Sequence, residues 1–337
     1  MKKKKVLLLI CCMTASPAAA VAHDIVTSRY SYREHVLPIL NAHCVRCHCP
    51  DGPAPFRLTS YLDARPRAEA IKEEVLLRNM PPWFAEEGKH RLIGEDRLSA
   101  TELDILVEWS SGGAPEGEGE VYTGTPRKGR APEVADLELE IPELTLAPGR
   151  KRKTVQVRLA TGLKQPAWIT AWELSTAKVD LLRLATLHLQ EVTAENYLGT
   201  RMSTDGKLSW KGAGAAIAPG QELVLTILYS RPWRLGNRKE GARGKLRLWT
   251  AEARPPRILQ ARKLKDSGKL PQEALLLGVY PTVPLRLVAA GRSDSLIEVF
   301  AAPADWPIFY RLSKPLQYPA GLEASPGAEG SILFTIP

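Results

Sequence analysis

Two cysteines and a histidine occur within five positions near the start of this 337-residue chain. Cys44 and Cys47 are separated by two residues, and His48 follows directly. Two thiols at this spacing can add to the two vinyl groups of one haem, and the next residue then supplies an imidazole nitrogen to the iron. The motif therefore predicts one covalently attached c-type haem with His48 as an axial ligand.

A structural zinc half-site and a redox-active dithiol are the alternatives for this motif. Zinc would need a second pair of ligands, and no other cysteine pair follows residue 22. A dithiol is expected at the start of a helix in a β-α-β setting, and the sequence shows no such pattern. We expect the odd thiol, Cys49, to be free and buried; a dimer disulfide or a regulatory thiol are its alternative roles.

A six-coordinate iron needs a second axial ligand. After residue 22 the chain has only two methionines, Met80 and Met202, and Met202 lies in a region with strand patterns. Pro81 and Pro82 follow Met80, end the preceding helix and fix the loop. A thioether ligand raises the reduction potential relative to two histidines. We predict Met80 as the ligand and Phe56, Trp83 and Trp109 as walls of the pocket; the alternative ligands are His35, His43 and His90.

The first 22 residues have the pattern of an export signal. Lys2 to Lys5 form a positive segment, Val6 to Met13 a short apolar core, and Ala20 to Ala22 a cleavage site. The core is too short to span a bilayer, and no later stretch reaches 18 apolar residues, so we expect no transmembrane segment in the mature chain. The predicted location is periplasmic. A lipid anchor at Cys11 or Cys12 is the alternative.

Composition excludes several protein classes. With 25% charged and 44% hydrophobic residues the chain is neither disordered nor collagen-like, and five cysteines are too few for a disulfide scaffold. Removal of the signal lowers the net charge from +9 to +5, of which residues 23–118 carry −5 and residues 119–337 carry +10. This asymmetry predicts two regions with different surfaces.

Hydrophobic periodicity also divides the chain in two. Helical spacing occurs over Tyr32 to His43 and Asp63 to Asn79, and Ser99 with Glu102 forms a capping box. After the stretch Gly112 to Arg127, rich in glycine, proline and charge, the period changes to two. Expected strands are Thr154–Ala160, Ala167–Leu174, Leu181–Leu189, Glu222–Ser230, Lys245–Thr250, Pro284–Ala290, Ser295–Ala301 and Ser331–Ile336.

Residues 30 to 118 resemble the small cytochrome c domain that many bacteria fuse to copper type II, ascorbate-dependent monooxygenase-like modules. The resemblance implies that Met80 is the distal iron ligand. It is carried by the strings Pro38–Leu40, Cys44–His48, Ala54–Phe56, Tyr61–Arg65, Met80–Trp83, Leu98–Ser99 and Trp109–Gly117.

The rest of the chain resembles, more weakly, the monooxygenase half, whose relatives include peptidylglycine hydroxylating monooxygenase and dopamine β-hydroxylase. Those enzymes have two jelly-roll-like sandwiches with one copper each. Where the family has copper ligands, this chain has Arg183–Leu184, Leu228 and Thr282–Pro284. Aliphatic side chains have no lone pair and a guanidinium repels a cation, so copper is not expected. His188 is the only histidine after residue 90.

The predicted fold class is therefore α + β multidomain, with an N-terminal all-α class I-type cytochrome c domain followed by an all-β jelly-roll-like region of one or two sandwiches. The predicted boundaries are 1–22 for the signal peptide, 23–118 for the monohaem domain, 119–135 for a linker, 136–255 for a first sandwich and 256–337 for a second, truncated one.

We expect an exported electron carrier rather than an enzyme, with the β region as a docking or scaffold module. The expected partners are periplasmic redox proteins or a membrane-bound respiratory complex. Basic runs such as Arg150–Lys153 could bind such a partner; the alternative is that they are solvated loops. Nucleic acid is not expected as a partner. The alternatives are a haem- or copper-dependent oxygenase or peroxidase-like enzyme and a structural haem subunit of a membrane-associated redox complex.

Overall fold

The structure is a computed structural model. It describes residues 27–50, 52–118, 133–176, 181–202, 206–231, 239–264, 270–304, 306–318 and 321–337. The predicted signal peptide, residues 1–22, lies outside these ranges, as does most of the predicted linker.

The chain is mostly β, and the predicted fold class is wrong. Strands account for 42% of the structure and helices for 15%. The residues assigned to an all-α domain include an extended segment, 81–98, whose Trp83, Phe84 and Ala85 are buried in a core of C-terminal strands. Because that segment is extended and packs with residues more than 200 positions away, the N-terminal third is not a self-contained helical domain.

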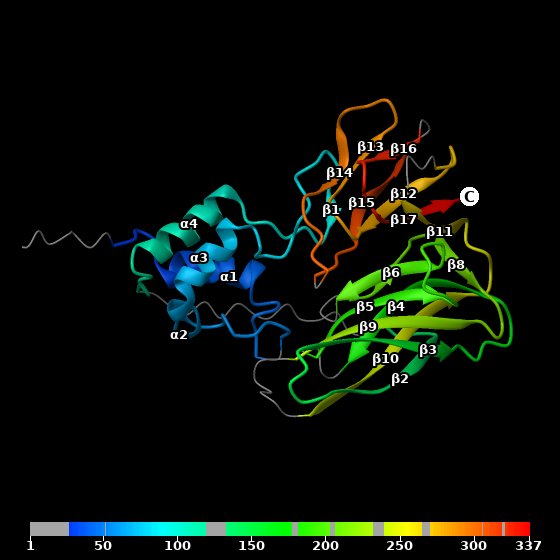
Figure 1. The fold of residues 1–337 in the computed structure, drawn as a ribbon, viewed down its shortest axis with the longest axis horizontal. Coiled ribbons are helices and arrows are strands. Elements are labelled where there is room, and N and C mark those ends of the chain that lie inside the picture. Colours follow the sequence, from blue (N-terminus) through cyan, green and yellow to red (C-terminus); the bar gives the residue numbers. More distant parts are fainter. Residues whose placement is uncertain are drawn as a thin grey trace, which may run out of the picture.

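Three short helical segments pack together at one side of the molecule (Figure 1). Their shared core includes Leu40, Ile71, Leu106 and Trp109, of which Leu40, Leu106 and Trp109 are fully buried. The predicted periodicity of these segments and the capping box at Ser99 are confirmed. The helices are η1 (Tyr32–Val36), α1 (Leu37–His43), α2 (Tyr61–Ala64), η2 (Arg65–Arg67), α3 (Ala68–Leu76) and α4 (Ala100–Ser111).

The middle of the chain forms two facing antiparallel layers around one core. One layer has the order β3-β9-β5-β6, and the other includes β8, β4, β10 and β2, with β7 beside β4. Trp172, Ile169, Leu187 and Leu225 are completely buried between them. The strands are β2 (Leu137–Leu146), β3 (Arg152–Ala160), β4 (Ala167–Thr176), β5 (Leu182–Leu189), β6 (Tyr197–Met202), β7 (Leu208–Ser209), β8 (Ala213–Ile217), β9 (Glu222–Ser230) and β10 (Glu240–Ala251).

The C-terminal strands build another core. The order β1-β15-β12-β17-β11 continues into the middle sheet through a parallel pair, β11 with β8, while β14-β13-β16 forms a separate small sheet. Figure 1 shows these strands beside the middle layers. The strands are β1 (Leu92–Ile93), β11 (Arg257–Leu264), β12 (Leu275–Pro281), β13 (Leu285–Ala289), β14 (Ser295–Val299), β15 (Tyr310–Gln317), β16 (Leu322–Ala324) and β17 (Gly330–Ile336).

Each strand expected from period-two patterning is present, with ends that differ by a few residues. Nine further strands of the described residues were not expected: β1, β2, β6, β7, β8, β11, β12, β15 and β16. Of these, β1 lies within residues 23–118, which were predicted to be all-α. It pairs with β15, Leu92 opposite Leu312 and Ile93 opposite Arg311. In the part of the chain that the structure describes, no helix is long and apolar enough to cross a membrane.

His188 is buried on β5, only 8% exposed, and its Nδ1 atom has no hydrogen-bond partner among the residues that the structure describes. Its ring packs edge-on against Tyr197, with 5.7 Å between the ring centroids. Burial lowers the pKa of His188 from 6.5 to about 4. The folded chain therefore holds this imidazole neutral at a pH where the unfolded chain protonates it.

We predict a loss of stability in acid that depends on His188. As the pH falls below 6.5 the unfolded state gains a proton that the folded state accepts only near 4, so stability is complete above 6.5 and falls through this window. The loss is roughly 3 kcal/mol. Denaturant unfolding of the parent and of His188→Leu at pH 7 and pH 4.5 measures it. A variant with the same pH dependence as the parent would contradict the prediction.

Candidate haem site

The cysteine motif continues the last turn of α1. The Cys44 N–H donates to the Leu40 carbonyl at 2.8 Å, and the N–H groups of Cys47 and His48 both donate to the Cys44 carbonyl, at 3.0 and 2.8 Å. This turn keeps residues three and four apart in sequence close together. The fold therefore gathers the two thiols and the imidazole of the motif at the end of one short helix.

His48 is buried and held by its own downstream loop. Its Nδ1 lies 3.0 Å from the carbonyl oxygen of Phe56, and the two rings are 4.6 Å apart between centroids. The Leu58 N–H closes the same loop by donating to the His48 carbonyl at 2.9 Å. A neutral imidazole that donates from Nδ1 keeps the Nε2 lone pair free for a metal. Burial lowers the pKa of His48, although the Phe56 carbonyl raises it, so the ring is neutral near pH 7.

The motif thiols are free and protonated. Within the described residues Cys44, Cys47 and Cys49 are free, and Cys49, expected to be buried, is only partly buried. Burial raises the pKa of Cys44 to about 12, with the negative charge of Asp96 adding to the effect, and burial also raises the pKa of Cys47. Two reduced thiols beside an imidazole with a free Nε2 are the donor set that covalent haem attachment requires. The residues present therefore fit this group.

Gly52 closes the loop against the motif. A Cβ atom at this position would lie 2.1 Å from the Cys47 carbonyl oxygen and 2.8 Å from the Cys49 sulfur. The Ala54 N–H donates to the same Cys47 carbonyl at 3.2 Å. Only glycine allows this close approach of the backbone to the motif.

His43, an alternative ligand in the sequence analysis, is bound by two carboxylates. Its Nδ1 lies 2.6 Å from Asp96 and its Nε2 lies 3.2 Å from Glu102, while Arg46 reaches Asp96 at 3.1 Å. Sequence reasoning identified Glu102 as a helix cap and missed Asp96, for which no local pattern exists. With both ring nitrogens paired, His43 is not available to the iron.

The other predicted site residues fall into two groups. Phe56 lies beside His48, and Trp109 is fully buried in the helical core, where its Nε1 donates to the Pro115 carbonyl. Met80 is half-buried just after α3, whose Ile71 and Val75 belong to that same core. Trp83 instead packs edge-on against Tyr310 in the C-terminal core, with 5.2 Å between centroids.

The two remaining alternative histidines have partners elsewhere. His35 accepts a hydrogen bond from the Ser31 N–H, and His90 lies 3.3 Å from the Tyr318 hydroxyl. Within the described ranges, no group of three or more His, Cys, Asp or Glu residues could hold a metal ion.

The positions where the resembled family has its first copper lie together. Leu184 of β5 pairs with Leu228 of β9, and the Arg183 guanidinium stacks on the Trp306 ring at 3.9 Å. A cavity of about 10 Å³ beside these positions is lined by Arg183, Leu184, Met202, Trp306 and Pro307. An arginine and two leucines do not fit a copper ion, because they supply no suitable lone pair.

We predict that His43 stabilises the fold below neutral pH. The hydrogen bond with Asp96 raises the pKa of His43, and Glu102 adds to it. The unfolded chain protonates His43 only below 6.5, so the pair's contribution is complete below that pH and is lost as pH rises through the folded pKa. The denaturant midpoint of His43→Gln should therefore lie below that of the parent, and the difference should be largest at pH values below 6.5. An equal difference at pH 5.5 and pH 9 would contradict this.

Comparison with known proteins adds little. No family model and no curated protein matches the chain. It is similar at 10% identity and a TM-score of 0.22 to a putative alpha-L-fucosidase from Bacteroides ovatus, over 56% of this chain and 36% of that one. The same identity and score relate 55% of it to 97% of the major capsid protein P2 of bacteriophage PM2. At this TM-score neither similarity bears on function.

Proposed function

We propose that the protein is an exported, periplasmic monohaem c-type cytochrome that transfers single electrons. Cys44 and Cys47 would hold the haem covalently, and His48 and Met80 would supply the ligands of its iron. The observation that supports this most strongly is the hydrogen bond between His48 Nδ1 and the Phe56 carbonyl, which aims a neutral imidazole with a free Nε2 away from its own loop. When bound, the haem supplies an iron that accepts and releases one electron.

The chain's own residues set the conditions for that iron. The Phe56 carbonyl fixes the tautomer and the orientation of His48, and the hydrogen bond increases the basicity of the ligand. Burial of His48 excludes water from its ring. The thioether of Met80 favours the reduced iron and so raises the potential.

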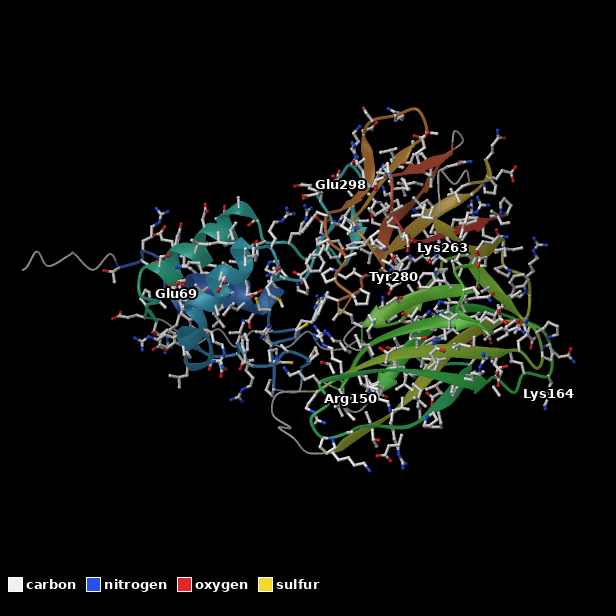
Figure 2. All side chains as sticks on the ribbon, viewed as in Figure 1. Glu69, Arg150, Lys164, Lys263, Tyr280 and Glu298 are labelled. Carbon is white, nitrogen blue, oxygen red and sulfur yellow. The ribbon has the colours of Figure 1, made fainter. Side chains whose placement is uncertain are left out.

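The β region is proposed as the docking and scaffold part. Its first turn, between β2 and β3, carries Arg150, Lys151 and Arg152, all exposed, and Figure 2 labels Arg150 at this edge. A positive patch steers association with a negatively charged partner surface. The proposed partner is therefore an acidic redox protein or an acidic face of a membrane-bound respiratory complex.

The covalent attachment can be tested on the exported chain. Cys44→Ser with Cys47→Ser should leave no haem bound to the polypeptide after denaturation and solvent extraction, whereas the parent retains it. Cys49→Ser is the matched control and should retain haem as the parent does. Haem that stays attached in the double variant would disprove the assignment.

The axial assignment predicts the effect of Met80→Ala. Loss of the thioether should lower the reduction potential and open a coordination site that binds carbon monoxide. Potentiometric titration and carbon monoxide difference spectra measure both, with Met202→Ala as the control that should change neither. If Met80→Ala had the same reduction potential as the parent, Met80 would be ruled out as a ligand of the iron.

A further inference from the structure

Met80 is fixed from its N-terminal side by the end of α3. The N–H groups of Asn79 and Met80 both donate to the Glu74 carbonyl, at 2.9 and 3.2 Å, and the Arg78 N–H donates to the Val75 carbonyl at 3.2 Å. The backbone at Met80 is therefore bonded to the last turn of α3, whose Ile71 and Val75 lie in the helical core.

On its C-terminal side, Met80 leads directly into the C-terminal core. Trp83, Phe84 and Ala85 are 7%, 6% and 0% exposed. The Phe84 N–H donates to the Tyr310 hydroxyl at 3.3 Å, and the Phe84 carbonyl accepts from the Phe300 N–H at 2.9 Å. The Glu86 N–H donates to the Glu298 carbonyl at 2.8 Å, and Figure 2 places Glu298 in the C-terminal part of the molecule, apart from Glu69 of α3.

Arg78 connects the two sides. Its guanidinium lies 4.1 Å above the Phe300 ring and makes two hydrogen bonds with Glu86, of 2.9 and 3.2 Å. Phe300 in turn packs edge-on against Phe84, with 5.9 Å between centroids. Arg78 and Phe84, on either side of Met80, thus both contact the ring of Phe300, which belongs to the C-terminal core.

The far end of the same segment returns to the motif. After β1 pairs with β15, Asp96 binds both His43 and Arg46, which flank Cys44. The segment 80–96 therefore begins at the proposed distal ligand, is anchored in the C-terminal strands, and ends at the attachment site.

We propose that the C-terminal strands β11 to β17 and the loops between them, here called the C-terminal β unit, position Met80. Contacts with Phe300 and Tyr310 would then determine whether the thioether is held at the iron. This rests on the proposed function. A thioether is a weak, uncharged ligand, and a ligand that is held in place loses less conformational freedom on bonding than one on a free loop. If these contacts were loosened, Met80 would no longer be held as a ligand for a haem iron, and that ligand position would be open to another molecule. The β unit is then a regulator of the haem as well as a scaffold.

The test compares three variants of the full-length, haem-loaded protein. Phe300→Leu removes the shared ring, Arg78→Ala removes the cation above it, and Phe300→Tyr keeps an aromatic face. The matched control is Arg183→Ala, which deletes the arginine–aromatic contact with Trp306, outside the segment 80–96. The readouts are the charge-transfer band of methionine-ligated ferric haem, the reduction potential and the fraction that binds carbon monoxide.

We expect Phe300→Leu and Arg78→Ala to weaken the band, to shift the potential part of the way to that of Met80→Ala and to increase carbon monoxide binding several-fold over the parent. Phe300→Tyr and Arg183→Ala should match the parent. Should Phe300→Leu fail to fold, Tyr310→Phe, which removes only the hydroxyl that accepts from Phe84, serves in its place.

Two results would overturn the inference, and they can be told apart. In the first, Phe300→Leu and Arg78→Ala keep the charge-transfer band and the reduction potential of the parent, while Met80→Ala changes both. Met80 would then ligate the iron without help from the β unit. An unchanged spectrum in Met80→Ala itself would remove Met80 as a ligand and the inference with it.

Discussion

The insertion of Trp83, Phe84 and Ala85 into the C-terminal core connects the N-terminal helices to the C-terminal strands. Tyr310 receives both the Trp83 ring and the Phe84 N–H, although it lies more than 220 residues away. Burial of large aromatic side chains of this kind contributes about 1.5–3 kcal/mol each. This contact anchors the segment between α3 and α4, and through it the helices that carry the cysteine motif.

The helices need such support because they are short. Helices α1 and α3 have seven and nine residues, below the length at which an isolated helix is stable in water. Their stability comes from the shared core around Leu40, Leu106 and Trp109 and from the segment that connects this core to the strands. A site built on such helices depends on tertiary packing, and the close approach of Gly52 and the hydrogen bonds of His48 with Phe56 and Leu58 add local contacts to it.

Local sequence patterns predicted local structure well and long-range packing poorly. The helical spacing of Ile71 and Val75, the Ser99 cap and the alternation in β9 each arise from residues close in sequence, and the structure has these elements. The all-α fold of residues 23–118 was wrong because Trp83 and Leu92 find their partners in β15. No periodicity within a short window reports such a partner. The two-residue strands β1 and β7 are likewise too short for period two to reveal. Strands β2 and β15, of ten and eight residues, were also not expected; each contains a proline, which weakens a strand pattern.

The candidate site shows the same division. The motif spacing identified Cys44, Cys47 and His48, and the turn after α1 brings them together as that spacing requires. The carbonyl of Phe56 as the partner of His48, and Asp96 as the partner of His43, depend on the course of two loops. Trp83 was expected to wall the haem pocket, and its ring packs edge-on against Tyr310 in the C-terminal core.

The central claim is one covalent haem on the exported chain and no copper in its β region. The most direct measurement is the iron and copper content per polypeptide, with the haem spectrum, of protein exported from cells able to mature c-type haem. One iron per chain, held in haem, and no copper are expected. Stoichiometric copper, or a chain without iron, would contradict it.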